Sequence, residues 1–273
     1  MIKILAAAYH EGELNEARHY HDCHQILFVK DGSVEVRLKS GTYQAKSGSL
    51  VFLNRFEEHA VCVKSEKYCR YVLNVSPKID ETGAEYKLFS ILFNRPIGFC
   101  NLLHVEKDIE EFEGIFLRIL KEMQKGDDTG KELTGLYAQE LLLKLFRLFP
   151  DVFSLFSDGN GELVYQIQKD FEMHYDQEIS LAALARRYGM SASYLSHLFK
   201  EITGSSVKGY LQTCRIAAAK KYLVKSNKRI GEIIELCGFS DHSNFSRTFK
   251  QCTGETPLSF RKKYHEKTFV TNE

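Results

Sequence analysis

A short stretch near the carboxyl end of the chain is written twice: Phe199-Lys-Glu-Ile-Thr-Gly204 returns fifty residues later as Phe249-Lys-Gln-Cys-Thr-Gly254. The match continues outward at the same offset, because Ser196 pairs with Ser246 and Tyr210 pairs with Phe260. A repeat at a fixed offset indicates two copies of one supersecondary unit.

Each copy has the pattern of a helix, a glycine turn and a second helix. In the first copy, Ser180 precedes an apolar stripe that ends at Gly189, and Ser191 begins the next helix. In the second, a stripe from Ile230 is broken by Gly238. A hydroxyl at a helix start and a glycine after its end are typical boundary signals. The pattern predicts two helix-turn-helix units.

The segment from Val207 to Val224 predicts one continuous helix between the two units. Its apolar residues recur at helical spacing, and it holds no proline. An 18-residue helix is about 27 Å long at about 1.5 Å per residue. Successive major-groove faces of one side of a duplex are about 34 Å apart. The spacing therefore favours two reading helices on one face of DNA.

These elements resemble the AraC/XylS family of transcription regulators. The resemblance rests on Ser191 to Gly204, on Arg215, on Cys237 to Lys250, and on Gly-Glu-Thr-Pro257 with Phe260-Arg261. It covers about a hundred residues at family-like spacing. It implies an amino-terminal domain that binds a small effector, often a sugar or similar metabolite, and a homodimer that acts with RNA polymerase. Activation is the commoner mode of regulation in this family, so the resemblance implies an activator.

The outward side chains of the two second helices are the predicted base readers, because the apolar side chains hold each helix on its scaffold. They are Ser193, Ser196, His197, His242, Ser243, Ser246 and Arg247. Arg247 is the strongest of them, since a guanidinium can bridge two acceptors of guanine. The predicted phosphate contacts are Lys200, Lys208, Arg215, Lys250, Arg261 and Lys262. For Arg215 an alternative stays open, in which it pairs with an acidic neighbour and fixes the angle between the units.

The charge distribution agrees with a nucleic-acid partner. The whole chain has a formal net charge of +1, but residues 180 to 267 hold 16 Lys or Arg and 6 Asp or Glu. Residues 1 to 157 hold 20 Lys or Arg and 23 Asp or Glu. The basic excess thus lies on the duplicated module. Without a membrane-span-length apolar run or a convincing signal peptide, and with seven cysteines lacking paired spacing, the sequence predicts a cytoplasmic protein.

The amino-terminal part predicts short strands closed into a barrel or sandwich. Strand-like runs occupy 26–29, 34–38, 42–45, 50–53, 60–63 and 68–75, with turn-forming residues between them. Just outside these runs, His19, His21, Gln25 and His59 stand where a cupin barrel, which this region resembles, has its metal ligands. Because Gln25 replaces the usual glutamate, no metal or other cofactor is predicted, and His19, His21 and His59 are only weak metal candidates.

An effector pocket is the favoured use of the barrel, and histidines that are merely solvated or bonded to backbone are the open alternative. The candidate effector-binding residues are His21, Gln25, Phe28, Arg37, His59 and Tyr71. Because strand alternation leaves the choice of face open, Arg37 can equally lie outside.

Two amphipathic helices follow, over Asp108 to Lys125 and Lys131 to Phe149, joined by a loop of residues 126–130. They either cover the barrel or mediate dimerisation, and one helix pair can do both. The predicted domains are a cupin-like sensing barrel at 1–105, the helix pair at 106–156, a linker at 157–162 and the DNA-binding domain at 163–267. The fold class is thus an all-β barrel with two helices, then an all-α domain with two helix-turn-helix units.

The sequence favours a DNA-binding regulator that responds to a small molecule, and not an enzyme. The main rival is a metal-dependent cupin enzyme with an accessory DNA-binding module, which Gln25 in the carboxylate position disfavours. A third hypothesis is a thiol redox sensor that uses Cys23, Cys62 or Cys69. Effector, operator and direction of regulation stay open.

Overall fold

The computed structural model describes residues 2–12, 15–38, 41–77, 88–92, 101–154 and 159–269. The chain divides into two compact units, Met1–Glu162 and Leu163–Glu273, which are described separately. No helix in the described ranges is long and apolar enough to span a bilayer.

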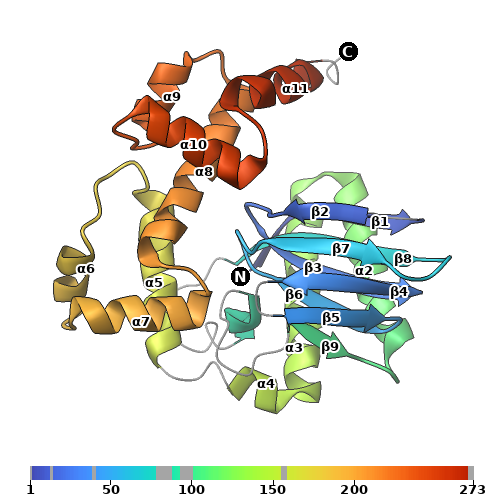
Figure 1. Ribbon diagram of the computed structural model, residues 1–273. Coiled ribbons are helices and arrows are strands. Elements are labelled where there is room, and N and C mark those ends of the chain that lie inside the picture. Colours follow the sequence, from blue (N-terminus) through green and yellow to red (C-terminus); the bar gives the residue numbers. More distant parts are fainter. Residues whose placement is uncertain are drawn as a thin grey trace. The chain divides into compact units, whose positions relative to one another are not determined.

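The first unit is built on two antiparallel sheets (Figure 1). A five-stranded sheet has the order β1-β8-β3-β6-β9, and a four-stranded sheet has the order β2-β7-β4-β5. The strands are β1 (Ile2–Glu11), β2 (Asn15–His19), β3 (His24–Asp31), β4 (Ser33–Leu38), β5 (Gly41–Lys46), β6 (Ser49–Leu53), β7 (His59–Val63), β8 (Cys69–Pro77) and β9 (Leu102–His104). The six predicted strands are confirmed as β3 to β8, whereas β1, β2 and β9 were not predicted.

The two sheets enclose one apolar core. Leu27 and Val29 of β3 pack in the same buried cluster as Val34 and Val36 of β4. Val61 of β7 completes the contact from the second sheet. Because side chains alternate along a strand, this cluster identifies the inward face of every strand that contributes to it.

Helices α2 (Ile109–Lys125) and α3 (Asp128–Leu148) cover the outer face of the five-stranded sheet and pack on β1 (Figure 1). Gly135 of α3 lies so close to β1 that an added Cβ would be 2.7 Å from the carbonyl oxygen of Ile2. The predicted five-residue loop between the helices is wrong. Gly126 ends α2 with φ 71°, and Asp127 caps α3 through the backbone N–H of Gly130. The short elements η1 (Ser90–Leu92) and α4 (Pro150–Ser154) complete this unit.

The second unit is helical. Its helices are α5 (Gly159–Met173), α6 (Leu181–Arg187), α7 (Ala192–Thr203), α8 (Val207–Lys225), α9 (Ile230–Leu236), α10 (His242–Thr253) and α11 (Pro257–Phe269). Figure 1 shows α8 running from the α6/α7 pair to the α9/α10 pair. Helix α5 begins at Gly159, so residues 159–162 of the predicted linker are helical.

Candidate nucleic-acid interface and effector site

The duplication extends to the hydrogen bonds that delimit the two candidate reading helices. The side chain of Ser191 accepts the N–H of Tyr194 at the start of α7, and that of Asp241 accepts the N–H of Asn244 at the start of α10. Each helix ends at a glycine with positive φ, 71° at Gly204 and 76° at Gly254. Two independent copies of the same caps give two helices of equal length, 12 residues each.

One face of each helix is buried and the other is exposed. Leu195 and Phe199 of α7, like Phe245 and Phe249 of α10, are fully buried. Of the predicted base readers, Ser193, His197, His242, Ser243 and Arg247 are exposed, and Ser196 and Ser246 are half-buried. The structure thus brings them onto two solvent-facing surfaces, one on each helix, as the outward spacing predicted.

Two further side chains share these surfaces, and neither was predicted. Tyr194 of α7 is 50% exposed, and Asn244 holds the equivalent position of α10, fifty residues later. The amide oxygen of Asn244 accepts hydrogen bonds from Arg247 and Thr248. The fifty-residue offset was the signal that could have identified both residues, because it matches outward positions as well as apolar ones.

The predicted phosphate contacts fall into two groups. Lys200, Lys208, Lys250 and Lys262 are exposed. Arg215 is half-buried and engaged within the fold, which disfavours its predicted phosphate role. Its Nε donates to the carbonyl oxygen of Tyr175 at 2.7 Å and its guanidinium to that of Gln177 at 2.8 Å. Burial lowers the pKa of Arg215, with nearby Asp176 opposing the shift. The residue ties α8 to the segment after α5, and its partners are carbonyls, not the acidic neighbour of the alternative.

Arg261 of α11 is also largely committed to the fold. Its guanidinium donates to the carbonyl oxygen of Lys228, before α9, at 2.7 Å. The side chain is half-buried. The phosphate role of Arg261 stays a prediction, and this bond is one that such a contact would have to compete with.

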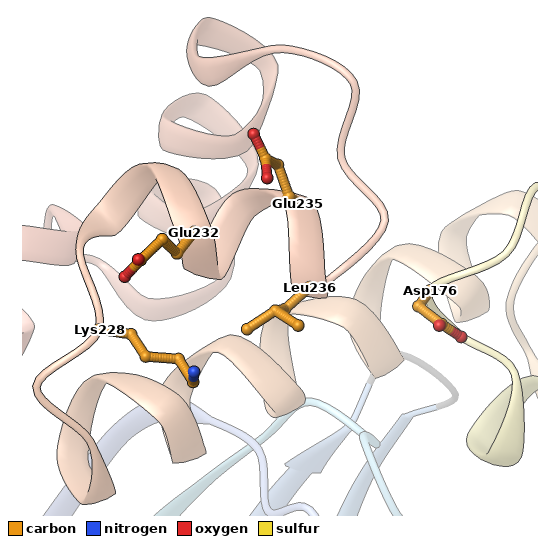
Figure 2. A pocket seen from close by; sticks show the side chains of 5 residues that line it. All are labelled: Asp176, Lys228, Glu232, Glu235 and Leu236. Atoms are coloured by element: carbon orange, nitrogen blue, oxygen red, sulfur yellow. The ribbon is translucent and has the colours of Figure 1, made fainter.

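The surface around α9 differs from these basic faces. Figure 2 shows a hollow lined by Glu232, Glu235 and Leu236 of α9, by Asp176 after α5, and by Lys228. Three carboxylates against one ammonium group repel phosphate. Cys237, the next residue after this face, is buried, which raises its pKa to about 12. We expect this side of the second unit to face away from DNA.

In the first unit, three predicted effector residues point away from the interior. Arg37 is exposed and pairs with Glu35 on the outer face of β4, since Val34 and Val36 point inward. Phe28 and Tyr71 lie on the opposite face of their sheet, where both rings pack against Phe116 of α2. The inward placement expected for these three side chains is therefore wrong, because none of them lies between the two sheets.

Tyr71 instead belongs to a polar group that joins the sheet to α2. Its hydroxyl donates to Glu113 at 2.7 Å, and Lys30 pairs with the same oxygen at 2.6 Å. Burial and the bond to Glu113 raise the pKa of Tyr71. For Glu113, burial alone raises the pKa, but the bonds from Lys30 and Tyr71 outweigh it and hold the pKa below 4.5.

Gln25 does face the interior, as predicted. It is 8% exposed, it shares the inward side of β3 with Leu27 and Val29, and its amide donates to Asn74 of β8 at 3.1 Å. A buried and a half-buried amide side by side in an apolar interior offer further donor and acceptor atoms to a polar ligand.

Arg70 is an interior residue that was not among the predicted effector-binding side chains. It is 6% exposed, and it lies opposite Val29 in the register of β3 and β8. Its guanidinium lies over the ring of Tyr68 at 5.3 Å and forms no ion pair with any residue that the structure describes. A buried cation without a carboxylate is uncommon, because its desolvation is not offset. Its position within the predicted apolar strand Tyr68 to Val75 was the signal that could have indicated a buried arginine.

The three weak metal candidates lie together. His19 ends β2 and His59 begins β7, and His21 follows β2. The Nε2 atoms of His19 and His21 are 3.2 Å apart, and one ligand nitrogen from each ring lies within 4.8 Å of the others.

The cysteines of the redox hypothesis are less exposed than such a sensor needs, since Cys23 and Cys69 are buried and Cys62 is half-buried.

Comparison with known proteins decides the family. Residues 184–263 match the model of a helix-turn-helix domain, and residues 5–146 match that of an AraC-like ligand binding domain. The chain belongs to the AraC family of transcription regulators. An uncharacterized helix-turn-helix regulator of Staphylococcus aureus strain MSSA476 is 30% identical over 242 residues, which are 86% of this chain and 31% of that protein. The chain therefore spans about a third of the length of this relative.

Other relatives agree with this membership. The bifunctional transcriptional activator and DNA repair enzyme AdaA of Bacillus subtilis is 34% identical over 102 residues, 37% of this AraC-family chain and 48% of AdaA. The fold resembles that of ToxT from Vibrio cholerae, with TM-score 0.60 and 14% identity over 94% of this chain and 98% of ToxT. The Staphylococcus aureus relative, which matches along both units, is a transcription regulator, in agreement with the two family models.

Proposed function

We propose that this AraC-family protein is a sequence-specific regulator whose helices α7 and α10 read two segments of one duplex. The observation that carries the proposal is the pair of equally capped, outward-facing helices joined by α8, which is 19 residues or about 28 Å long. Exposed Lys200, Lys208, Lys250 and Lys262 contact phosphates beside the two reading faces. It acts on genomic DNA in the cytoplasm.

The base-reading role is tested at Arg247, which is exposed and whose guanidinium donates to Asn244 of its own helix. Arg247→Ala is expected to weaken cognate DNA binding about 5- to 150-fold, the range of one bidentate base contact. Binding to random DNA stays nearly constant. The control is Arg229→Ala, an exposed arginine beside the acidic hollow of α9. Equal losses on cognate and random DNA would remove the base-reading role.

The effector is a small polar metabolite, sugar-related or a carboxylic acid, held between the two sheets. Buried Gln25 and half-buried Asn74 offer amide groups, and Arg70 offers a positive charge that prefers an anionic group. A solved structure of ToxT holds an unsaturated fatty acid, which is consistent with a carboxylate ligand. A thermal-shift screen of neutral and acidic metabolites tests this. If an acid stabilises Arg70→Gln as strongly as it stabilises the unaltered chain, Arg70 does not bind the anionic group of the effector.

Two copies assemble through α2 and α3, and the dimer contacts RNA polymerase. The outer side of this helix pair carries three exposed leucines, Leu117 at 50%, Leu136 at 56% and Leu143 at 51%. Exposed apolar side chains gathered on one helix pair favour self-association. Leu136→Glu is expected to give a monomer by analytical ultracentrifugation, and an unchanged mass would contradict this interface.

A further inference from the structure

We propose that His19, His21 and His59 form a binding site for one divalent transition-metal ion, of which zinc is the first to test. The proposal goes beyond the regulatory function above, and DNA recognition does not depend on it. It rests on the position of three rings, the fixed tautomer of one of them, and the ligand chemistry of imidazole.

A local irregularity in β2 brings two of the rings together. Asn15 and Glu16 pair with Cys62 and Val61, but the next pair is His19 with His59, so three steps along β2 match two along β7. Such a bulge re-aims the side chains that follow it. His19 thereby lies directly opposite His59, with ring centroids 4.3 Å apart. The one-residue shift is what gives two histidines the same cross-strand position.

The third ring closes the group. His21 lies 4.9 Å from His19 and 5.2 Å from His59, measured between ring centroids. In a tetrahedral zinc site with bonds of about 2.0 to 2.1 Å, two ligand nitrogens are about 3.4 Å apart. The Nε2 atoms of His19 and His21, 3.2 Å apart, already have this separation. The largest separation in the group, 4.8 Å, needs only a small ring rotation to match.

His59 is prepared to offer its outer nitrogen. Its Nδ1 is 2.9 Å from the carbonyl oxygen of Glu57, an acceptor that requires Nδ1 to carry the hydrogen. The lone pair is then on Nε2. The same arrangement, a ligand histidine bonded through its second nitrogen to a carbonyl, orients ligands in metal sites. Because His59 is 2% exposed and begins a strand, its ring direction is set by the fold.

The donor set decides which ions fit. Three neutral imidazoles suit zinc, copper or nickel, whereas magnesium and calcium require oxygen ligands. The group of three contains no carboxylate, and Gln25, the alternative oxygen ligand of the sequence analysis, donates its amide to Asn74. Zinc with three protein ligands keeps one position for water or an anionic ligand. The ion would connect β2, β7 and the segment before β3.

The test uses the full chain, stripped of metal with a chelator and titrated with zinc against a chromophoric competitor. We expect one tight equivalent per chain, a rise in the melting temperature of the first unit, and intense visible absorption when Co²⁺ replaces zinc. His21→Ala, which alters a half-buried residue, is expected to bind at least about tenfold more weakly, with no rise in melting temperature. His59→Ala should behave alike.

His104→Ala is the matched control, because it removes a half-buried histidine of β9 in the same unit that is not in the group of three. It should bind zinc like the unaltered chain. The proposal is overturned if the unaltered chain binds less than one equivalent, or if His21→Ala keeps full affinity. Either result would mean that His19 and His21 simply share a hydrogen bond. DNA affinity of the stripped chain is measured in parallel, and its loss in every variant would count against the regulatory function instead.

Discussion

At the scale of single residues, Arg215 and Lys250 show how equal charges on the helical unit serve different purposes. Arg215 donates to two backbone carbonyls beside its ring contact with Phe239. Lys250 is exposed in the last turn of α10 and donates to no described side chain. A guanidinium can satisfy several fixed acceptors at once, whereas an exposed ammonium group stays free to meet phosphate.

This difference predicts opposite effects of two alanine substitutions. Arg215→Ala is expected to lower the stability of the second unit by about 1 to 3 kcal/mol, because two charge-assisted hydrogen bonds are lost from a half-buried site. Lys250→Ala is expected to leave stability unchanged and to reduce the salt dependence of DNA binding by about one ion. Urea unfolding and DNA titrations at several salt concentrations measure both. An unaltered unfolding curve for Arg215→Ala contradicts the structural role.

Glu113 gives the first unit a predictable response to acid. Because its folded pKa lies below 4.5, the unfolded chain binds a proton first as the pH falls. The stability from its bonds to Lys30 and Tyr71 is therefore present above pH 4.5 and is lost as the pH falls through the lower, folded value. Glu113→Gln should be less stable than the unaltered chain at pH 7, and the difference should shrink on acidification. Glu110→Gln, exposed on the same helix, is the control for unfolding curves measured across this range.

At the scale of elements, the two turn glycines differ in what an added side chain would meet: backbone strain alone at one, and strain plus a clash at the other. Gly189 and Gly238 hold the same place in the two units, with φ 68° and 72°. A Cβ at Gly189 meets nothing within 4 Å, but at Gly238 it would lie 2.4 Å from the carbonyl oxygen of Asp176. Gly189→Ala is expected to cost about 1 to 2 kcal/mol from backbone strain, and Gly238→Ala about 2 to 5 kcal/mol because a clash is added. Equal melting temperatures for the two variants would contradict the close approach.

The elements also show what the sequence could predict. The caps, turn glycines and apolar stripes of α7 and α10 are local signals repeated twice, so both helices were predicted. The inward and outward faces of β3 were not predicted, because Gln25 to Val29 are all buried. The second sheet covers one face of the strand, and α2 covers the other. Without alternation, Phe28 could not be assigned to a side. Strand β1 was missed because its central alanines carry no strand signal, and it gains its pairing from distant β8.

The same limit applies to the candidate sites. Exposed base readers follow from helical spacing alone, since their apolar neighbours are fixed. The interior residues depend on partners far along the chain: Gln25 bonds Asn74, and Arg70 faces Val29. The grouping of three histidines depends on a bulge that no local pattern announces. Which side chains face the barrel interior therefore depends on the pairing of distant strands, whereas the exposed faces of the reading helices follow from local sequence.

At the scale of the whole molecule, the decisive property is that α8 fixes the distance between its two reading helices. It is continuous from Val207 to Lys225, begins at a Ser206 cap, and contacts α7, α10 and α11. A helix packed along its length cannot stretch to follow a lengthened operator. One chain should therefore accept only one separation between the two DNA segments that it reads.

Insertions into the operator test this rigidity. Five added base pairs turn the second segment to the opposite face of the duplex, and ten restore the face but move it about 34 Å along the axis. With a rigid α8, both insertions should lower the affinity of one chain at least about tenfold, to the value for a single occupied segment. A flexible connection would recover affinity at ten base pairs and not at five. Recovery at ten in gel-shift titrations, with a five-base-pair insertion outside the contacted segments as the control, would show that α8 does not set the spacing.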